Sequence, residues 1–534
     1  MQPSSPKPTL RHLLTETDRF VTAVELVTSR GLITEGRARR VLTLARELAS
    51  HPLIDVLSIT DNPAGNAMLA ADTMGTELIL RGQEVIIRLA CKDWNRNAIK
   101  SRAWKLSSEG FDNVLALSGD FPTGGYHGLA APVFDIDSVG LLRMFTDMNE
   151  GIPFDGPGGV HESTRFFMGA TVTNHKRHER EVMPQYLKLA KKIANGARFI
   201  ITQIGYHARK DDELLKWMAT QDLHVPVIAN VYVLSRAAAR AFNGGRVPGV
   251  VVSDVLLGVV ERHAASADHG RSFFLELAAK QVAVARGLGY RGAYLGGRPE
   301  VADCEEILRR AAAYGPDDGQ ALAREIQFPA PGEFHYFERD DEAELASTEI
   351  NRAYLASKQR RRGRGAPVRY KVSRAVHAAA FAPDAPPRGP ARALYGRVER
   401  GPSPVGRALH LMEQASKIPL FGCRDCGDCS LPDIAYLCPE SQCVKNQRNG
   451  PCGGTREGRG ARLRPSQGLR RRDDHARRNR GDQGQRSAAH ERLGPTPSSG
   501  ATTMRRSIVE LHRHRRERSH HEGHPPHRCA RRQR

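Results

Sequence analysis

Six cysteines near the end of the chain have the residue type and spacing of a metal centre. They are Cys423, Cys426, Cys429, Cys438, Cys443 and Cys452, in the pattern C-x2-C-x2-C-x8-C-x4-C-x8-C. Closely spaced thiolates can wrap a tetrahedral zinc ion, which takes four ligands, and the C-x2-C-x2-C run also occurs around iron–sulfur clusters. The sequence therefore predicts a site for zinc or for an iron–sulfur cluster, with disulfides as the weaker alternative.

A second group of polar residues stands directly after short apolar runs. Thr60 and Asp61 follow IDVLSI, Gly119 and Asp120 follow NVLALS, and Gln203 ends ARFIITQ. In an α/β barrel the carboxyl ends of all strands meet at one mouth, where catalytic residues lie. We therefore expect these side chains to line one site.

Eight apolar or β-branched runs, separated by helical patterns, must position these residues. The runs cover residues 21–27, 54–60, 84–90, 113–118, 165–172, 197–203, 225–231 and 291–296. Helical patterns between them include residues 35–50 and 183–195. Strands that alternate with helices in this number predict an α/β fold, a closed (β/α)8 TIM barrel. An open doubly wound sheet is the alternative.

The chain has 534 residues and a formal net charge of +21, much of it near the C-terminus. Residues 455–534 contain 22 Arg, no Lys, 8 acidic residues and no Phe, Tyr or Trp. A segment of this composition cannot build a core, so we expect it to be disordered. A GC-rich gene read in the wrong frame gives Arg without Lys, so a frameshifted tail and a genuine basic tail both stay open. The composition argues against nucleic-acid binding, which the overall charge alone would suggest.

These features divide the chain into four predicted parts. Residues 1–330 form the barrel, 331–415 an extension and linker, 416–457 a small metal-binding domain and 458–534 the Arg-rich tail. No run of 18 apolar residues occurs, so no membrane-spanning helix is predicted. The N-terminus has no apolar core of a secretory signal. We therefore expect a cytoplasmic protein.

Several of these stretches resemble one enzyme family. NVLALSGDFPTGG (113–125) resembles the flavin-binding core of methylenetetrahydrofolate reductases, where a strand ends in Gly-Asp followed by Pro. Further matches follow the same order along the chain: VELVTSRG (24–31), LSITDNPAGN (57–66), RLACKDWN (88–95) and KKIANGARFIITQ (191–203). The resemblance implies a flavin-dependent enzyme on a TIM barrel.

The cysteine-rich segment carries a second resemblance to the same family. Residues 421–454 are similar to the C-terminal domain found fused to, or partnered with, some of these reductases. Family members continue with a further Cys, where this chain has Gly460. This departure supports the frameshift interpretation of the tail.

The resemblance also assigns roles to three residues near the predicted strand ends. Glu25 is the implied general acid, which delivers a proton to the departing nitrogen of the folate. Asp120 lies near both the flavin ring and the pterin, where its charge favours hydride donation. Gln203 binds the amide edge of the pterin, because its side chain can both donate and accept hydrogen bonds.

The implied cofactor is FAD, with FMN as an alternative. The residues expected to bind it are Thr60, Arg88, Gly119, Asp120, His175 and Lys192. Thr60 and Lys192 would contact the ribityl-diphosphate arm, Lys192 as a point charge. Arg88 stands where the family usually has His, and its guanidinium can still bind phosphate.

The function that the resemblance implies is reduction of 5,10-methylenetetrahydrofolate to 5-methyltetrahydrofolate, in one-carbon metabolism and methionine biosynthesis. Reduced flavin supplies the hydride, because no side chain can. NAD(P)H is the expected electron donor, or another carrier through an electron-transfer partner protein, and a homo-oligomer is expected. The alternative function is that of a non-reducing, folate- or corrinoid-linked accessory protein in methyl transfer.

Overall fold

The computed structural model describes most of the chain up to residue 455. The described residues are 7–152, 159–297, 299–315, 318–364, 368–380, 385, 389–390, 393 and 404–455. They fall into two units, one made of residues up to 363 together with 442–455, the other of residues 364–441. The predicted tail, residues 458–534, lies outside the described residues.

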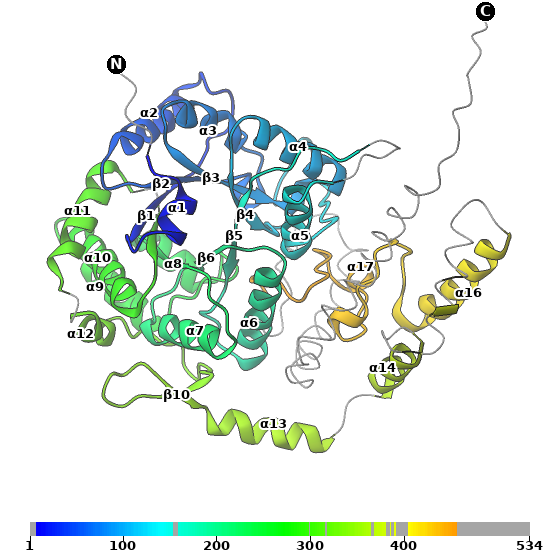
Figure 1. The fold of residues 1–534 in the computed structure, drawn as a ribbon. Helices are drawn as coiled ribbons and strands as arrows, with labels where there is room; N and C mark the ends of the chain where they lie inside the picture. The colour runs from blue at the N-terminus through cyan, green and yellow to red at the C-terminus, as the bar shows by residue number, and fades with distance from the viewer. Residues whose placement is uncertain are drawn as a thin grey trace, which may run out of the picture. The chain divides into compact units, whose positions relative to one another are not determined.

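Eight parallel strands close into a barrel in chain order, β1 to β8 (Figure 1). Their bounds are β1 Val21–Leu26, β2 Val56–Ile59, β3 Glu84–Ala90, β4 Asn113–Leu117, β5 Phe167–Val172, β6 Phe199–Thr202, β7 Val227–Tyr232 and β8 Gly292–Gly296. The barrel closes through pairing of β1 with β8. The predicted TIM barrel and all eight predicted strands are confirmed, and the open-sheet alternative is wrong.

Helices follow the strands and surround the barrel (Figure 1). Their bounds are α1 Leu10–Thr15, α2 Gly36–Ser50, η1 Pro63–Gly65, α3 Ala71–Leu80, η2 Cys91–Asp93, α4 Arg96–Ser108, α5 Ser138–Asn149, α6 Glu179–Ala194, α7 Ala208–Thr220, α8 Arg236–Asn243, α9 Asp254–His263, α10 Arg271–Leu288, α11 Val301–Ala313 and α12 Asp318–Glu325. The helix predicted for residues 35–50 is confirmed. The helix predicted to begin at residue 183 begins at Glu179.

Strand alternation fills the interior of the barrel with apolar side chains. One buried cluster inside the barrel contains Val21, Ala23, Val56, Ile86 and Tyr294. Helix α1, near the N-terminus of the chain, adds its apolar side chains to this cluster. Successive residues of a strand point to opposite faces, so the next inward position lies two residues further on. Glu25 on β1 and Arg88 on β3 occupy such positions, above the apolar layer at the carboxyl ends of the strands.

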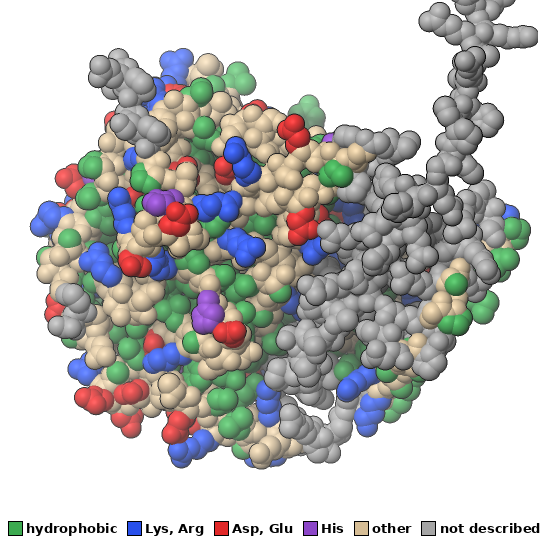
Figure 2. Space-filling model, in the orientation of Figure 1, with side chains coloured by type: hydrophobic (Ala, Val, Ile, Leu, Met, Phe, Trp, Pro, Cys, Tyr) green, Lys and Arg blue, Asp and Glu red, His purple; other side chains and the backbone are tan. Residues whose placement is uncertain are grey.

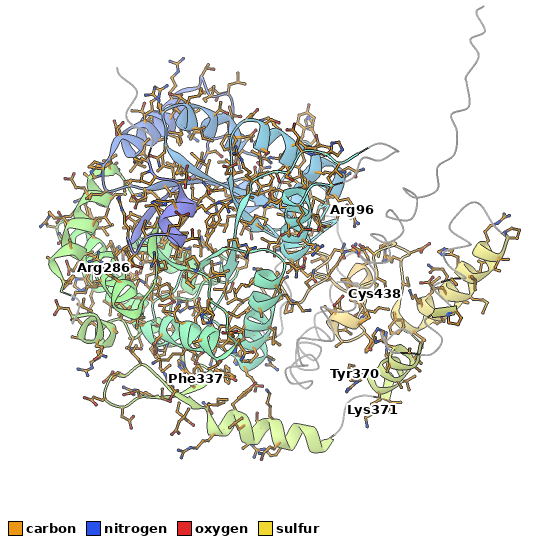
Figure 3. The ribbon with its side chains drawn as sticks, in the orientation of Figure 1. Arg96, Arg286, Phe337, Tyr370, Lys371 and Cys438 are labelled. Carbon is orange, nitrogen blue, oxygen red and sulfur yellow. The ribbon has the colours of Figure 1, made fainter. Side chains whose placement is uncertain are left out.

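A hairpin after α12 packs against α7. It consists of β9 Phe337–Arg339 and β10 Ala346–Ile350, paired antiparallel. The fully buried carboxylate of Glu213 on α7 accepts from the backbone N–H groups of Tyr336 and Phe337, at 2.6 and 3.3 Å (Phe337 is labelled in Figure 3). The hairpin thereby covers the outer surface of α7.

The stretch expected to be a linker contains helices. They are α13 Arg352–Arg364, α14 Val368–Ala380 and α16 Pro404–Phe421, followed by η3 Pro432–Ile434 and α17 Pro439–Gln442. Among the residues that the structure describes, no helix has both the length and the apolar character that a membrane span needs. On the face of the barrel unit drawn in Figure 2, acidic and basic side chains are interspersed.

Candidate active site at the barrel mouth

An ion pair between two inward-facing side chains forms the centre of the barrel mouth. Arg88 Nη1 on β3 lies 2.5 Å from Glu25 Oε1 on β1 and 3.1 Å from the hydroxyl of Tyr294 on β8. Both charged side chains are about four-fifths buried. The geometry places the carboxylate of Glu25 beside a fixed positive charge.

The charge of Asp120 acts on the same pair. Burial opposes the charge of Arg88, but Tyr294, Glu25 and Asp120 outweigh it and raise the pKa of the guanidinium above its ordinary value. Asp120 itself is exposed at the end of β4. The structure thus brings together Glu25, Arg88 and Asp120, three of the predicted site residues.

The turn that carries Asp120 requires a glycine. Gly119 has a φ of +83°, a conformation that L side chains rarely adopt. A Cβ at this position would meet the side chains of Ala90 and Lys92 at 3.0–3.1 Å. The close approach of this turn to the end of β3 explains why the sequence has Gly-Asp there.

Several buried polar atoms at the mouth have no hydrogen-bond partner among the described residues. They are the hydroxyls of Thr28, Ser29 and Thr60 and the amide oxygen of Asn230. They follow β1 and β2 or lie on β7. Since buried polar groups in folded proteins are nearly always paired, these atoms fit a polar ligand that binds at the mouth. Thr60, a predicted flavin contact, is one of them.

Gln203 directly follows β6 at the mouth, one residue beyond the strand that was predicted to end with it. Its backbone N–H donates to Val172 O at 2.8 Å, and its Oε1 accepts from the N–H of Ile204 at 3.0 Å. A Cβ at Gly249, in the loop after α8, would lie 3.4 Å from Gln203 Nε2. The amide group of Gln203 therefore faces a glycine loop that leaves space beside it.

Lys192 lies buried on the inner face of α6. Its Nζ donates to Thr171 O on β5 at 2.5 Å. Burial, together with the nearby charge of Lys188, lowers the pKa of Lys192 to about 7. An anionic ligand would stabilise the protonated form of such a buried amine. The predicted contact of Lys192 with a cofactor phosphate stays a prediction.

His175 is turned away from the ion pair. Its Nε2 lies 2.9 Å from Asp211 Oδ1 on α7, and its ring packs against Gly205, where a Cβ would collide with it at 2.0 Å. The described residues hold His175 between β5 and α7. Its predicted contact with a cofactor stays a prediction.

The predicted metal ligands are divided between the two units. Cys423, Cys426 and Cys429 lie in one loop of the second unit, where burial raises the pKa of Cys429 and Lys417 partly offsets it. Cys438 belongs to the same unit, whereas the last two, Cys443 and Cys452, belong to the barrel unit. Metal binding by these cysteines stays a prediction.

A different group gathers ligand-type atoms within the barrel unit. His207, Glu333 and His335 place one ligand atom each within 4.8 Å of one another. His207 Nδ1 lies 2.9 Å from Glu333 Oε2, and Lys210 and His207 hold the pKa of Glu333 below its ordinary value although burial opposes this. The positive charge of Lys210 also lies close to this group. We therefore interpret the group as an ion pair that holds residues 326–337 against α7.

Sequence reasoning missed five residues at or near the mouth. They are Asp137 and Lys188, which form a buried ion pair at 3.3 Å, Tyr294, Asn230 and Lys445. Asn230 could have been found, because it interrupts the apolar run VPVIANV at an inward position. The others reach the site through contacts between distant parts of the chain, which leave no local pattern.

The fold and the mouth define a class: a (β/α)8 barrel with a buried ion pair and unpaired polar groups at the carboxyl ends of its strands. Residues 34–281 match the family described as methylenetetrahydrofolate reductase. Residues 404–463 match the family described as methylene-tetrahydrofolate reductase C terminal. The two matches confirm the resemblance to methylenetetrahydrofolate reductases seen in the sequence.

Solved structures show only remote likeness. A protein from Clostridium thermocellum that binds two copies of 5-methyl-5,6,7,8-tetrahydrofolic acid is 13% identical, with a TM-score of 0.39, over 55% of this chain and 94% of that one. Dihydropteroate synthase from Xanthomonas albilineans is 12% identical, with a TM-score of 0.30, over 55% of this chain and 93% of that one. A search of curated protein sequences gives no match.

Proposed function

We propose that this protein reduces 5,10-methylenetetrahydrofolate to 5-methyltetrahydrofolate with a bound flavin. The observation that carries the proposal is the Glu25–Arg88 ion pair at the mouth of a barrel of the methylenetetrahydrofolate reductase family. The reaction needs a proton on the departing nitrogen of the folate ring and a hydride on the exposed carbon. The mouth offers a carboxylate for the first step and unpaired polar groups to hold a cofactor for the second.

The residues present fit a flavin, FAD or FMN. The unpaired hydroxyl of Thr60, the glycine turn at Gly119 and the amine of Lys192 would hold its ribityl and phosphate groups. When bound, reduced flavin supplies the hydride and is reduced again by NAD(P)H or by a carrier protein. The carboxylate of Asp120 next to the Gly119 turn would orient the pterin and favour hydride donation.

Glu25 is the proposed proton donor, and Arg88 is proposed to hold it in place. The guanidinium Nη1 lies 2.5 Å from Glu25 Oε1 and so orients the carboxyl group at the mouth. Arg88 also interacts with the charge of Asp120, which links the two carboxyl groups of the proposed site. In the reaction the carboxyl group of Glu25 would deliver a proton to the departing nitrogen of the folate.

The experiment combines a spectrum with one variant. The purified protein should show flavin absorbance near ~450 nm that reductant bleaches and methylenetetrahydrofolate restores. Glu25→Gln should keep the absorbance and reduction by donor but lose at least about 100-fold in folate turnover, as expected for loss of a general acid. Glu16→Gln, an exposed carboxylate paired with His12, is the matched control and should keep full activity.

A second candidate function is a non-reducing accessory role in methyl transfer. It is favoured by the cysteine-rich segment, which matches a domain found alongside these reductases. The same experiment separates the two functions. A colourless protein that takes up no flavin, or a Glu25→Gln variant that turns over folate like the wild type, would overturn the reductase proposal.

The cysteine-rich segment is proposed to bind zinc or an iron–sulfur cluster. Cys423, Cys426 and Cys429 share one loop, and burial, with a smaller contribution from the other two thiols, raises the pKa of Cys429. Such a loop suits a structural metal that would stabilise a small unit with few buried apolar residues. Metal analysis of the purified protein distinguishes zinc from iron and sulfide.

A further inference from the structure

A short segment after the second unit returns to the barrel and enters its mouth. We call residues 442–455 the C-terminal arm, and Figure 1 draws it in orange beside α5 and α6. Five consecutive polar residues of the arm, residues 445–449, are each at most 8% exposed. Long polar side chains are rarely buried to this degree unless they have specific partners. The partners of the arm therefore indicate what it does.

The first partners of the arm lie at the end of β4. Lys445 Nζ donates to Gly119 O at 2.9 Å, on the turn that carries Asp120. The hydroxyl of Ser118 donates to Gln447 Oε1 at 3.0 Å. Two successive residues of the proposed flavin-binding turn are thus bonded to side chains of the arm. The loop after this turn is fixed from its other side by Arg96, which is labelled in Figure 3 and pairs with Asp135 at 2.8 Å.

The middle of the arm is bonded to α5 and α6. Lys188 Nζ donates to Gln447 Oε1 at 2.8 Å and to Gly450 O at 2.9 Å. Asn449 Nδ2 donates to Asp137 Oδ1 at 2.8 Å. Each of these groups is almost completely buried. Buried hydrogen bonds of this kind hold the arm, α5 and α6 in one arrangement.

The end of the arm reaches the end of β6, two strands along from β4, beside Gln203. A Cβ at Gly249 would lie 3.0 Å from Gly453 O and 3.4 Å from Gln203 Nε2. A Cβ at Gly453 would collide with Thr173 Oγ1 at 2.3 Å. The arm, the Gly249 loop and the amide of Gln203 therefore meet at one point, where only glycines fit.

We propose that the C-terminal arm is part of the folate-binding pocket, a clasp that holds the Asp120 turn and Gln203 at the spacing a reduced pterin requires. The arm spans from Gly119 to Gln203, the two strand ends that carry the proposed pterin contacts. Lys445 is the positioning residue at one end and Gly453 at the other. The folate part of this inference rests on the proposed function, whereas the holding of the turn does not.

The first test removes the bond between Lys445 and the Gly119 turn. Lys445→Met keeps the length of the side chain but removes its charge and donors. We expect hydrogen exchange in residues 113–121 to become faster, and the dissociation constant of 5-methyltetrahydrofolate, measured by calorimetry, to rise about tenfold. Lys445→Arg restores a charged donor and should return both values toward wild type. Lys371→Met, on an exposed position of α14, is the control.

The second test uses the close contact at the other end. Gly453→Ala should weaken folate binding, because the added methyl group displaces the arm from Thr173. Gly453→Ala combined with Thr173→Ala should restore binding, since the second change removes the oxygen atom that the methyl group meets. Thr173→Ala alone should bind folate like the wild type.

Each outcome decides the proposal. Wild-type exchange in residues 113–121 of Lys445→Met would overturn the clasp, as would unchanged folate affinity in both Lys445→Met and Gly453→Ala. A wild-type protein that binds no 5-methyltetrahydrofolate overturns the proposed function and the folate role of the arm with it. In that case the exchange measurement still decides whether Lys445 holds the turn.

Discussion

At the scale of single residues, the mouth of the barrel contains charges that are largely buried and paired across strands. Glu25 and Arg88 come from β1 and β3, and Tyr294 from β8 completes the contact. None of these residues is adjacent in the sequence. Strand alternation brings them together, because Glu25 and Arg88 occupy inward positions directly above the apolar layer that contains Tyr294. The chemistry of the site is thus a consequence of strand register.

The lowered pKa of Lys192 predicts how the folding stability of the protein depends on pH. The pKa of its amine is about 7 in the folded protein and 10.5 for an unperturbed lysine, so between these values the unfolded chain binds the extra proton. Stability therefore rises with pH across this window. Lys192→Met should lack this rise, and its stability relative to wild type should fall by on the order of 3 kcal/mol between pH 6.5 and 9.5.

The measurement is urea unfolding of both proteins at the two pH values. Lys191→Met, the partly exposed neighbour on α6, is the control and should show the same pH dependence as the wild type. If the stability difference between Lys192→Met and wild type does not change with pH, Lys192 is not a buried amine with a lowered pKa. Flavin binding at pH 8 should take up a proton in the wild type and none in Lys192→Met.

At the scale of elements, local patterns predicted the barrel well. All eight strands begin within two residues of the predicted starts, because each is a short apolar run bounded by turn residues. The start of α6 was predicted four residues late, since Pro184 looks like a first helical residue. In the structure Pro184 lies inside the helix, and a capping box between His178 and Glu181 begins it.

The arm could not be predicted from such patterns. Lys445 and Gly119 are 326 residues apart, and the arm has no regular secondary structure of its own beyond the end of α17. Its contacts depend on polar side chains that look solvent-exposed in the sequence. The candidate site was therefore predicted on the strand side, at Glu25, Asp120 and Gln203, and missed on the arm side.

The buried ion pair between Asp137 and Lys188, which the arm contacts, leads to a prediction about stability. Lys188, Gly140 N–H and Asn449 together outweigh burial and hold the pKa of Asp137 below its ordinary value. Its stabilising effect is present above the ordinary carboxyl range and is lost as the pH falls through the lowered pKa. Asp137→Asn leaves the buried ammonium group of Lys188 without a partner of opposite charge. This substitution should destabilise the protein by about 3–5 kcal/mol at neutral pH.

Thermal unfolding at pH 7 and pH 3 checks this expectation, because the difference from wild type should shrink at pH 3. The control is Asp147→Asn on the same helix, which breaks an exposed pair with Arg143. Such a surface pair contributes at most about 1 kcal/mol. Equal effects of the two substitutions would contradict the importance of the buried pair.

At the scale of the whole molecule, most of the excess positive charge lies outside the part of the chain that contains the proposed site. The site proposed here uses residues between Glu25 and Thr455, whereas residues 455–534 alone contain 22 Arg and 8 acidic residues. The barrel face in Figure 2 mixes both signs of charge. An Arg-rich segment binds polyanions through counterion release, without any defined site. The high net charge therefore predicts only nonspecific binding of polyanions at low salt, not a nucleic-acid function.

Deletion of residues 456–534 separates these two properties. The shortened chain keeps every residue of the barrel, the arm and the six-cysteine segment, so flavin content, folate turnover and metal content per chain should equal those of the full chain. Binding to single-stranded RNA in 50 mM salt should be steep in salt for the full chain, with a slope of several units, and nearly absent after deletion. A shortened chain that still binds RNA would place the basic surface on the folded units, and one that loses flavin would show that the segment supports the site.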